Sequence, residues 1–189
     1  MASWPVFPWP AQPPSDARCV VLALPLPVSL PRPEARAHVR QAARAYIATR
    51  LGCVPDAVPL QTRPGLAPQV IGSAFGVSFS HEPGCSLIAL HWDGPVGVDL
   101  MHVALPDDWA VLARDYLGAA VARRLAGIAA AQRAQAFSQA WTELEAEFKL
   151  RGEALREWQS GDEAITIAHR RLALALPRGF VGTLALQGR

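Results

Sequence analysis

Two residues one helical turn apart, Glu145 and Lys149, are the first candidates for chemistry in this sequence. On a helix of about 100° per residue, both lie beside an apolar face made of Phe137, Trp141, Leu144 and Phe148. Lys149 is the only lysine in the chain, and the other 17 of the 18 cationic side chains are arginines. This choice indicates that a compact ammonium is wanted there. The alternative is an ordinary helix ion pair that stabilises the fold only slightly.

A carboxylate partner for Glu145 has to come from another element. Glu143 and Glu147 each lie about 160° from Glu145 on the helical wheel, so neither shares its face. The remaining candidate is Asp99, which stands inside an apolar run of strand composition, residues 96–100. Because a buried lone carboxylate is costly, Asp99 must lie at a strand end, be paired, or bind a metal.

A third candidate is the pair Ser80 and His81, at the end of the run VSFSH (77–81). Taken alone, His81 is equally explained as a histidine whose hydrogen bonds are satisfied in a loop. His81 is a candidate site residue because it precedes Asp99 and the helix that contains Glu145 in the chain.

The elements that would position these residues alternate along the chain. Hydrophobic periodicity and Pro or Gly punctuation predict helices over 33–51, 107–117, 119–126 and 129–150. Strands are predicted over 17–24, 77–80, 86–91, 96–100, 164–168, 172–176 and 180–186. The proline-rich stretch 55–70 is predicted to be a loop, and residues 1–14, with five prolines and two tryptophans, an extended arm along the body or against a partner. This order favours two small αβ halves that pack together.

The composition excludes several classes of function. With 51% hydrophobic and 18% charged residues, a net charge of +2 and no long basic run, the chain is globular and is not expected to bind nucleic acid. Cys19, Cys53 and Cys85 have no spacing typical of a disulfide framework or a zinc site, and are expected to be small buried residues. The absence of a membrane-span-length apolar run and of a signal-peptide pattern favours a cytoplasmic protein without membrane association.

The three patterns together resemble the 4′-phosphopantetheinyl transferase superfamily, in particular its Sfp-type, holo-acyl-carrier-protein synthase-like group. The motifs of that group run F-x-x-S-H, then [VI]-G-[VI]-D, then W-x-x-K-E-A-x-x-K, and this chain has VSFSH (77–81), GVDL (97–100) and WTELEAEFK (141–149). The resemblance covers about residues 17–186. It implies an α+β fold of two similar αβ halves with pseudo-twofold symmetry. We accordingly expect an arm over 1–15, an N-terminal half over 16–103 and a C-terminal half over 104–189, with the active site between the halves.

The resemblance also implies an activity, the transfer of the 4′-phosphopantetheine arm of coenzyme A to a serine of an apo acyl or peptidyl carrier protein. By its motifs, Asp99 and Glu145 would bind Mg²⁺, Glu145 would act as the base, and Lys149 would contact phosphate. Ser80 and His81 would contact coenzyme A, with the histidine at the 3′-phosphate. A chain with two halves is expected to be a monomer, and the carrier could belong to fatty-acid, polyketide or nonribosomal peptide biosynthesis.

The sequence departs from the motifs at several positions. Met101 replaces the second acid of D-x-E, and Leu144 replaces the lysine of W-x-x-K-E. The glycine-lysine-proline element that usually precedes F-x-x-S-H is reduced to residues 65–68. Arg63 is therefore the expected substitute for its phosphate contact. An alternative function is therefore a degenerate member that binds coenzyme A or a carrier protein without turnover. A purely structural role would require the motif order to arise by chance.

Overall fold

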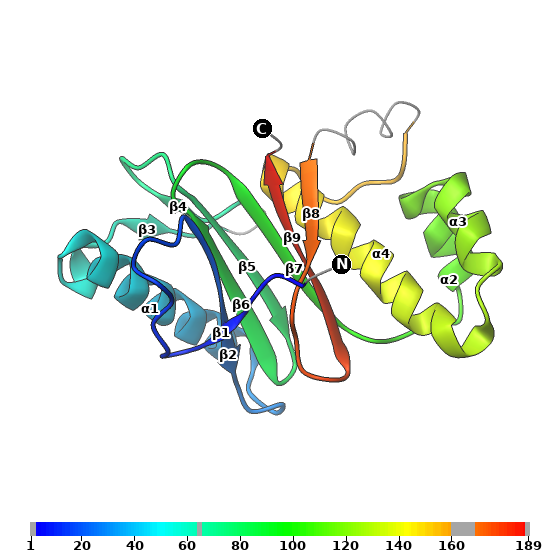
Figure 1. Cartoon of the computed structure of the whole chain (residues 1–189), viewed down its shortest axis with the longest axis horizontal. Helices are drawn as coiled ribbons and strands as arrows, with labels where there is room; N and C mark the ends of the chain where they lie inside the picture. Colours follow the sequence, from blue (N-terminus) through cyan, green and yellow to red (C-terminus); the bar gives the residue numbers. More distant parts are fainter. Residues whose placement is uncertain (1–2, 64–65, 160–168, 188–189) are drawn as a thin grey trace.

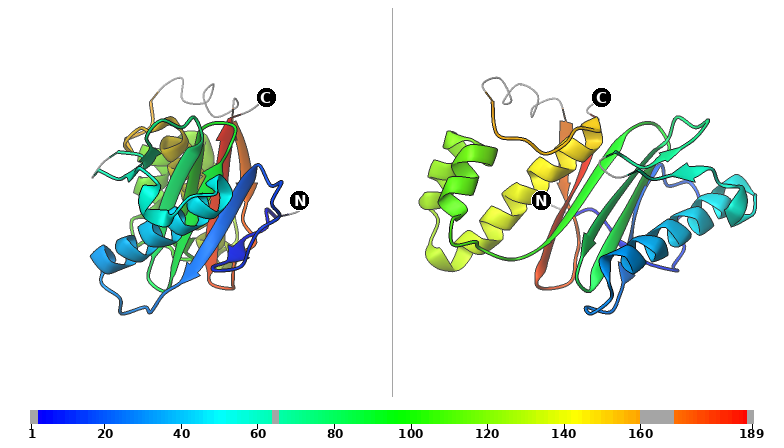
Figure 2. Two further views of the ribbon diagram at one scale, coloured as in Figure 1. Left: turned by 90° about the vertical axis from the view of Figure 1, so that its left-hand side faces the viewer. Right: turned by 180° about the vertical axis from the view of Figure 1, so that it is seen from behind.

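The protein is built in four layers, which are helix α1, a four-stranded sheet, a three-stranded sheet and helix α4 (Figures 1 and 2). The structure is a computed structural model that describes residues 3–63, 66–159 and 169–187. This mixed architecture confirms the predicted α+β class. The pseudo-twofold relation of the halves stays a prediction.

The first sheet has the strand order β1-β2-β6-β5. Its members are β1 (Phe7–Pro8), β2 (Cys19–Pro25), β5 (Gly76–Glu82) and β6 (Cys85–His91). β1 runs parallel to β2, and the other pairs are antiparallel. The last three strands were predicted from their apolar content. β5 and β6 extend beyond the predicted ranges 77–80 and 86–91, whereas β2 begins two residues later and ends one residue later than the predicted 17–24.

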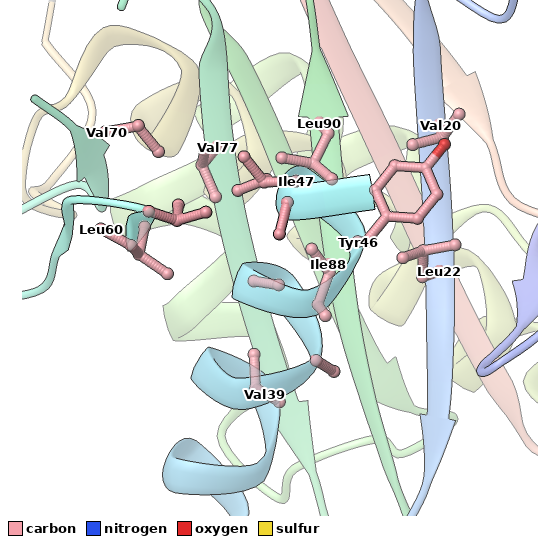
Figure 3. Close-up of a cluster of buried hydrophobic side chains, with 14 of the residues drawn as sticks. Val20, Leu22, Val39, Tyr46, Ile47, Leu60, Val70, Val77, Ile88 and Leu90 are labelled. Atoms are coloured by element: carbon pink, nitrogen blue, oxygen red, sulfur yellow. The ribbon is translucent and has the colours of Figure 1, made fainter. Parts of the chain in front are cut away.

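Helix α1 (Arg32–Leu51) covers one face of this sheet. Its buried side chains Val39, Tyr46 and Ile47 pack against the strands in one apolar cluster, whose labelled members in Figure 3 also include Val20, Leu22, Leu60, Val70, Val77, Ile88 and Leu90. The helix ends at Gly52, which adopts a left-handed conformation (φ 68°) and donates its N–H to Ala48 O. The predicted stop at this glycine is confirmed.

The opposite face of the first sheet packs on the second sheet, whose order is β7-β9-β8. These antiparallel strands are β7 (Val96–His102), β8 (His169–Ala173) and β9 (Phe180–Gln187). By its pairing with β9, β7 belongs to the C-terminal sheet although it precedes the expected boundary at residue 103, and the domain boundaries stay a prediction. The predicted strand 164–168 lies outside the described residues.

Helix α4 (Ala130–Arg151) buries two different faces. Small residues on one face lie against the second sheet, where Ala146 and Leu150 pack with Ala185 of β9. The predicted aromatic face, with Phe137 and Trp141, packs instead against a small helical cluster. That cluster consists of α2 (Trp109–Leu112), a π-helical turn η2 (Ala113–Leu117) and α3 (Ala119–Ala126).

The N-terminal arm lies along the body, one of its two expected arrangements. Its β1 pairs with β2, and Trp4 forms backbone hydrogen bonds with Ala173, the last residue of β8, and with Ala175 just beyond it. The arm therefore connects both sheets.

The proline-rich stretch contains only short elements, η1 (Pro55–Ala57), β3 (Leu60–Gln61) and β4 (Gln69–Val70). All three cysteines are free. Cys85 is buried as expected, whereas the expectation is wrong for Cys53, which is exposed because it directly follows the end of α1. Within the described residues, no helix has both the length and the apolar character that crossing a bilayer requires.

Candidate active site

The candidate site forms where β5 of the first sheet meets β7 of the second. Two serine hydroxyls join these strands: Ser78 Oγ accepts the Val98 N–H at 3.0 Å, and Ser80 Oγ accepts the Leu100 N–H at 3.1 Å. In an ordinary sheet, backbone carbonyls would accept these N–H groups. The alternating serines of VSFSH therefore hold the two sheets together and bring Ser80 next to Asp99.

Asp99 is only 4% exposed, and its Oδ1 has two partners. The Ser80 hydroxyl donates to it at 2.8 Å, and the Lys149 ammonium lies 2.6 Å away. Lys149 also donates to Val98 O at 3.1 Å. Of the three explanations left open for this strand carboxylate, pairing is the one that the structure contains.

Gly97 allows α4 to come close enough for these contacts. A Cβ at this position would overlap Ala146 O and would lie 2.6 Å from Leu150 N. Because the strand presents no side chain there, the helix backbone rests directly on it. Lys149, one turn beyond Glu145, consequently reaches β7.

Glu145 has its two carboxylate oxygens in different surroundings. Oε1 accepts the Trp141 indole N–H at 2.9 Å, while Oε2 lies 4.0 Å from Lys149 Nζ. Burial, followed by the negative charge of Asp99, raises the pKa of Glu145, and Lys149 and the indole N–H partly offset the rise. The pKa of this carboxyl group therefore lies above that of an ordinary glutamate.

The other two acids of α4 point away, as the helical wheel predicts. Arg171 of β8 lies 3.6 Å from Glu143 and 3.9 Å from Glu147. These acids lie toward β8, the strand at the opposite edge of the second sheet from β7, and therefore do not join Asp99.

Cationic side chains line the other part of the cleft. A pocket of about 580 Å³ is bordered by Arg36 and Arg40 of α1, Arg63, His81 and Lys149. A second pocket of about 380 Å³ shares Arg36, His81 and Lys149 and contains Asp99 and Glu145. The shared residues make the two pockets one cleft with a basic end and an acidic end.

His81 faces this cleft as a neutral imidazole. Its Nδ1 lies 3.0 Å from Ser86 Oγ on the neighbouring strand. Burial lowers the pKa of His81 to about 4, with further contributions from the positive charges of Arg36, Lys149, Arg32 and Arg40. At neutral pH the ring therefore carries one proton.

The structure brings five of the predicted site residues together, namely Ser80, His81, Asp99, Glu145 and Lys149. Arg63 lines the basic pocket but not the acidic one. Of two arginines on α1, Arg40 lines this pocket, whereas Arg44 donates to Leu60 O at 3.0 Å.

Three further charged residues of the cleft were missed from sequence. Arg32 and Arg36 line the pockets, and their four-residue spacing with Arg40 along α1 was the available signal. Glu82, directly after His81, also lines the acidic pocket. Burial is the largest cause that raises the pKa of Glu82. The charge of His102 opposes this rise, and the negative charge of Asp99 adds to it.

The residues present fit a divalent cation that takes two ligands from the protein and the others from phosphate and water. In the described part of the chain, no three His, Cys, Asp or Glu side chains are grouped as a metal centre. Asp99 and Glu145 do converge, and the Lys149 ammonium is the cation near both. Mg²⁺ is bound through one or two carboxylates plus phosphate oxygens and water, so this donor set suits it.

Comparison with known protein families finds a match in the C-terminal part of the chain. Residues 95–178 match the model described as the 4′-phosphopantetheinyl transferase superfamily, and this segment includes Asp99, Glu145 and Lys149. No curated protein matches the chain. The matched segment runs from the start of β7 through α4 to the turn before β9. The order of the motifs and this match agree, and residues 95–178 of the chain are similar to the 4′-phosphopantetheinyl transferase superfamily.

Proposed function

We propose that this protein transfers the 4′-phosphopantetheine arm of coenzyme A to a serine of an apo acyl or peptidyl carrier protein, with Mg²⁺. The observation that carries the proposal is the single cleft in which Asp99 and Glu145 adjoin a row of cationic side chains. The superfamily supports phosphopantetheine transfer in general.

The basic end suits the phosphates of coenzyme A. Arginine side chains bind phosphate oxygens through charge-assisted, often bidentate hydrogen bonds. Arg36, Arg40 and Arg63 project from two separate elements around this pocket, with His81 between them and the acidic end. We assign the 3′-phosphate and the pyrophosphate to this part of the cleft.

Asp99 and Glu145 would hold the Mg²⁺ ion. Bound there, it would supply charge neutralisation at the pyrophosphate oxygens. Glu82 adds a third carboxylate to the same pocket. Three negative charges favour a bound cation at this end of the cleft and disfavour a bound anion.

Glu145 is the base in the proposed reaction. The serine oxygen forms a bond to the phosphorus that carries the pantetheine arm, the bond from this phosphorus to the bridging oxygen breaks, and adenosine 3′,5′-bisphosphate leaves. The serine proton passes to Glu145 Oε2, because Oε1 is occupied by the Trp141 N–H. Lys149, which lines both pockets, stabilises the negative charge on the phosphate oxygens.

A second candidate is a member that binds coenzyme A or a carrier protein without turnover. Met101 and Leu144, which stand where relatives have an acid and a lysine, both pack against the apolar cluster around Phe137. An apolar surface thus replaces two charges beside Glu145, which favours this alternative.

Mass spectrometry of the carrier distinguishes the two. The protein is incubated with coenzyme A, Mg²⁺ and several apo carrier proteins from fatty-acid, polyketide and peptide synthesis. Active transfer adds one phosphopantetheine to the carrier. Measurable coenzyme A binding without any mass gain would support the second candidate instead.

The carrier is proposed to dock near Arg114 of η2 and Arg123 and Arg124 of α3, which are exposed. Charged side chains at such a surface raise the rate of association with an acidic partner helix. We also propose a cytoplasmic location, a monomeric state and the Sfp-type subgroup.

A further inference from the structure

Ser86 of β6 is a polar residue in an apolar row. Residues 86, 88 and 90 of a strand face the same way, and here Ile88 and Leu90 lie in the core beneath α1. Ser86 is 0% exposed. A buried hydroxyl needs a hydrogen-bond partner, so its presence among these residues calls for a specific contact.

That contact is with the cleft histidine. Ser86 and His81 are directly paired across β5 and β6, and Ser86 Oγ lies 3.0 Å from His81 Nδ1. Among the described residues, this is the hydrogen bond that the structure gives to the Ser86 side chain. The hydroxyl therefore fixes one ring nitrogen of His81 and leaves Nε2 for a ligand.

Which atom donates decides what Nε2 can do. At neutral pH, His81 carries one ring proton because burial and the positive charges of Arg36 and Lys149 lower its pKa to about 4. If the serine hydroxyl donates to Nδ1, the proton is on Nε2, which can donate to an anion. If Nδ1 held the proton, Nε2 would present a lone pair, and a phosphate oxygen would be repelled.

We propose that Ser86 is a positioning residue that holds His81 as the Nε2–H tautomer, so that a neutral imidazole donates a hydrogen bond to a phosphate of coenzyme A. This inference rests on the proposed function, which supplies the ligand. Ser86 itself does not touch coenzyme A. Its influence on binding passes through His81.

A double-mutant cycle on coenzyme A binding tests the proposal. Calorimetry compares the wild type, Ser86→Ala, His81→Ala and the double variant. Ser86→Ala is expected to weaken binding about three- to tenfold, the range for one hydrogen bond, and to have no further effect in the His81→Ala background. Ser86→Thr, which keeps the hydroxyl, is expected to restore much of the affinity. Thermal unfolding checks that each variant is folded.

Nitrogen-15 NMR of the ring supplies a readout independent of binding. In the free wild-type protein, the His81 signals, identified by their loss in His81→Ala, should show a protonated Nε2. Ser86→Ala should change the Nδ1 shift. Unchanged His81 shifts, unchanged coenzyme A affinity, or additive losses in the double variant would each overturn the proposal. A wild type that binds no coenzyme A would overturn the proposed function, while the ring shifts would still decide whether Ser86 sets the tautomer.

Discussion

Glu145 presents one restrained oxygen and one accessible oxygen to the cleft. The Trp141 indole holds Oε1, and Oε2 is left beside Lys149 at 4.0 Å. Fixing one oxygen leaves fewer orientations for the carboxylate, so a proton acceptor is already directed toward the site where the serine would arrive.

Removing the charge of Glu145 is the most direct test of this role. Glu145→Gln keeps the shape and the acceptor for Trp141 but cannot take a proton, and turnover is expected to fall about 10²- to 10⁴-fold. Asp99→Asn should also abolish turnover, because it removes the charge that Lys149 and the proposed cation neutralise. Initial rates of carrier modification measure both.

Glu143→Gln is the matched control, because Glu143 lies on the same helix but faces Arg171. Its turnover is expected to stay at the wild-type level. Wild-type rates in Glu145→Gln would rule out this residue as the base.

The Trp141 hydrogen bond should be visible in the pH dependence. Glu145 acts as a base only when ionised, so activity is lost as the pH falls through its raised pKa. The indole N–H favours the ionised form. Trp141→Phe keeps an aromatic ring next to Phe137 but removes this donor, so the pKa rises further and the acidic limb of the kcat profile moves to higher pH.

Trp109→Phe provides the control for that shift. Trp109 packs under Arg133 and lies outside the pockets that contain Glu145. The two variants should differ in the position of the acidic limb. Identical profiles would show that the indole does not influence Glu145.

At the level of single residues, types and spacing predicted much of the site. A lone acid in an apolar strand and a lone lysine one turn after a glutamate are unusual choices, and the structure brings Asp99 and Lys149 to within 2.6 Å. Ser86 and Glu82 were missed because a serine in a strand, or an acid before a turn, is ordinary in sequence. Only their positions across β5 and β6 reveal their contacts.

The packing of α4 on β7 is what carries Glu145 and Lys149 to the site. The ends of α4 were predicted to within one residue, since its glycine stop and aromatic periodicity are strong local signals. Its sheet-facing side was not predicted, because Ala146 and its small neighbours form no hydrophobic stripe. The close approach depends on the absence of a side chain at Gly97.

Gly97→Ala is therefore expected to disturb both stability and activity. The added methyl overlaps Ala146 O and cannot be accommodated without moving α4, which should lower the free energy of unfolding by about 1–3 kcal/mol. Denaturant unfolding measures this loss. Because the shift withdraws Lys149 from Asp99, turnover should fall even at temperatures where the variant is fully folded.

Gly127→Ala is a suitable comparison. A Cβ at Gly127 would lie 3.5 Å from Arg124 O, an ordinary contact, and the backbone there is right-handed. This variant should be as stable as the wild type or slightly more stable. Equal stability of the two alanine variants would contradict the close-packing argument.

Across the whole molecule, the site depends on the junction between the two sheets. Apolar patterns predicted both sheets separately, but local periodicity contains no information on how two strand edges meet. The junction uses the hydroxyls of Ser78 and Ser80 and the core that both sheets share. The N-terminal arm, which was predicted to lie along the body or against a partner, links the same two sheets on the other side, at β2 and at the end of β8.

The arm gives a test at this scale. Trp4 packs against the core shared by the sheets, and its backbone bonds to Ala173 and Ala175 while β1 pairs with β2. Trp4→Ala is expected to lower the free energy of unfolding by about 3 kcal/mol, since it leaves a cavity beside both sheets. Hydrogen exchange should show weaker protection in β2 and in β9 together. Val28→Ala, at a side chain that is 75% exposed, should change neither. Loss of protection confined to one sheet would show that the arm stabilises that sheet alone, and the cleft would then depend on the serine junction without help from the arm.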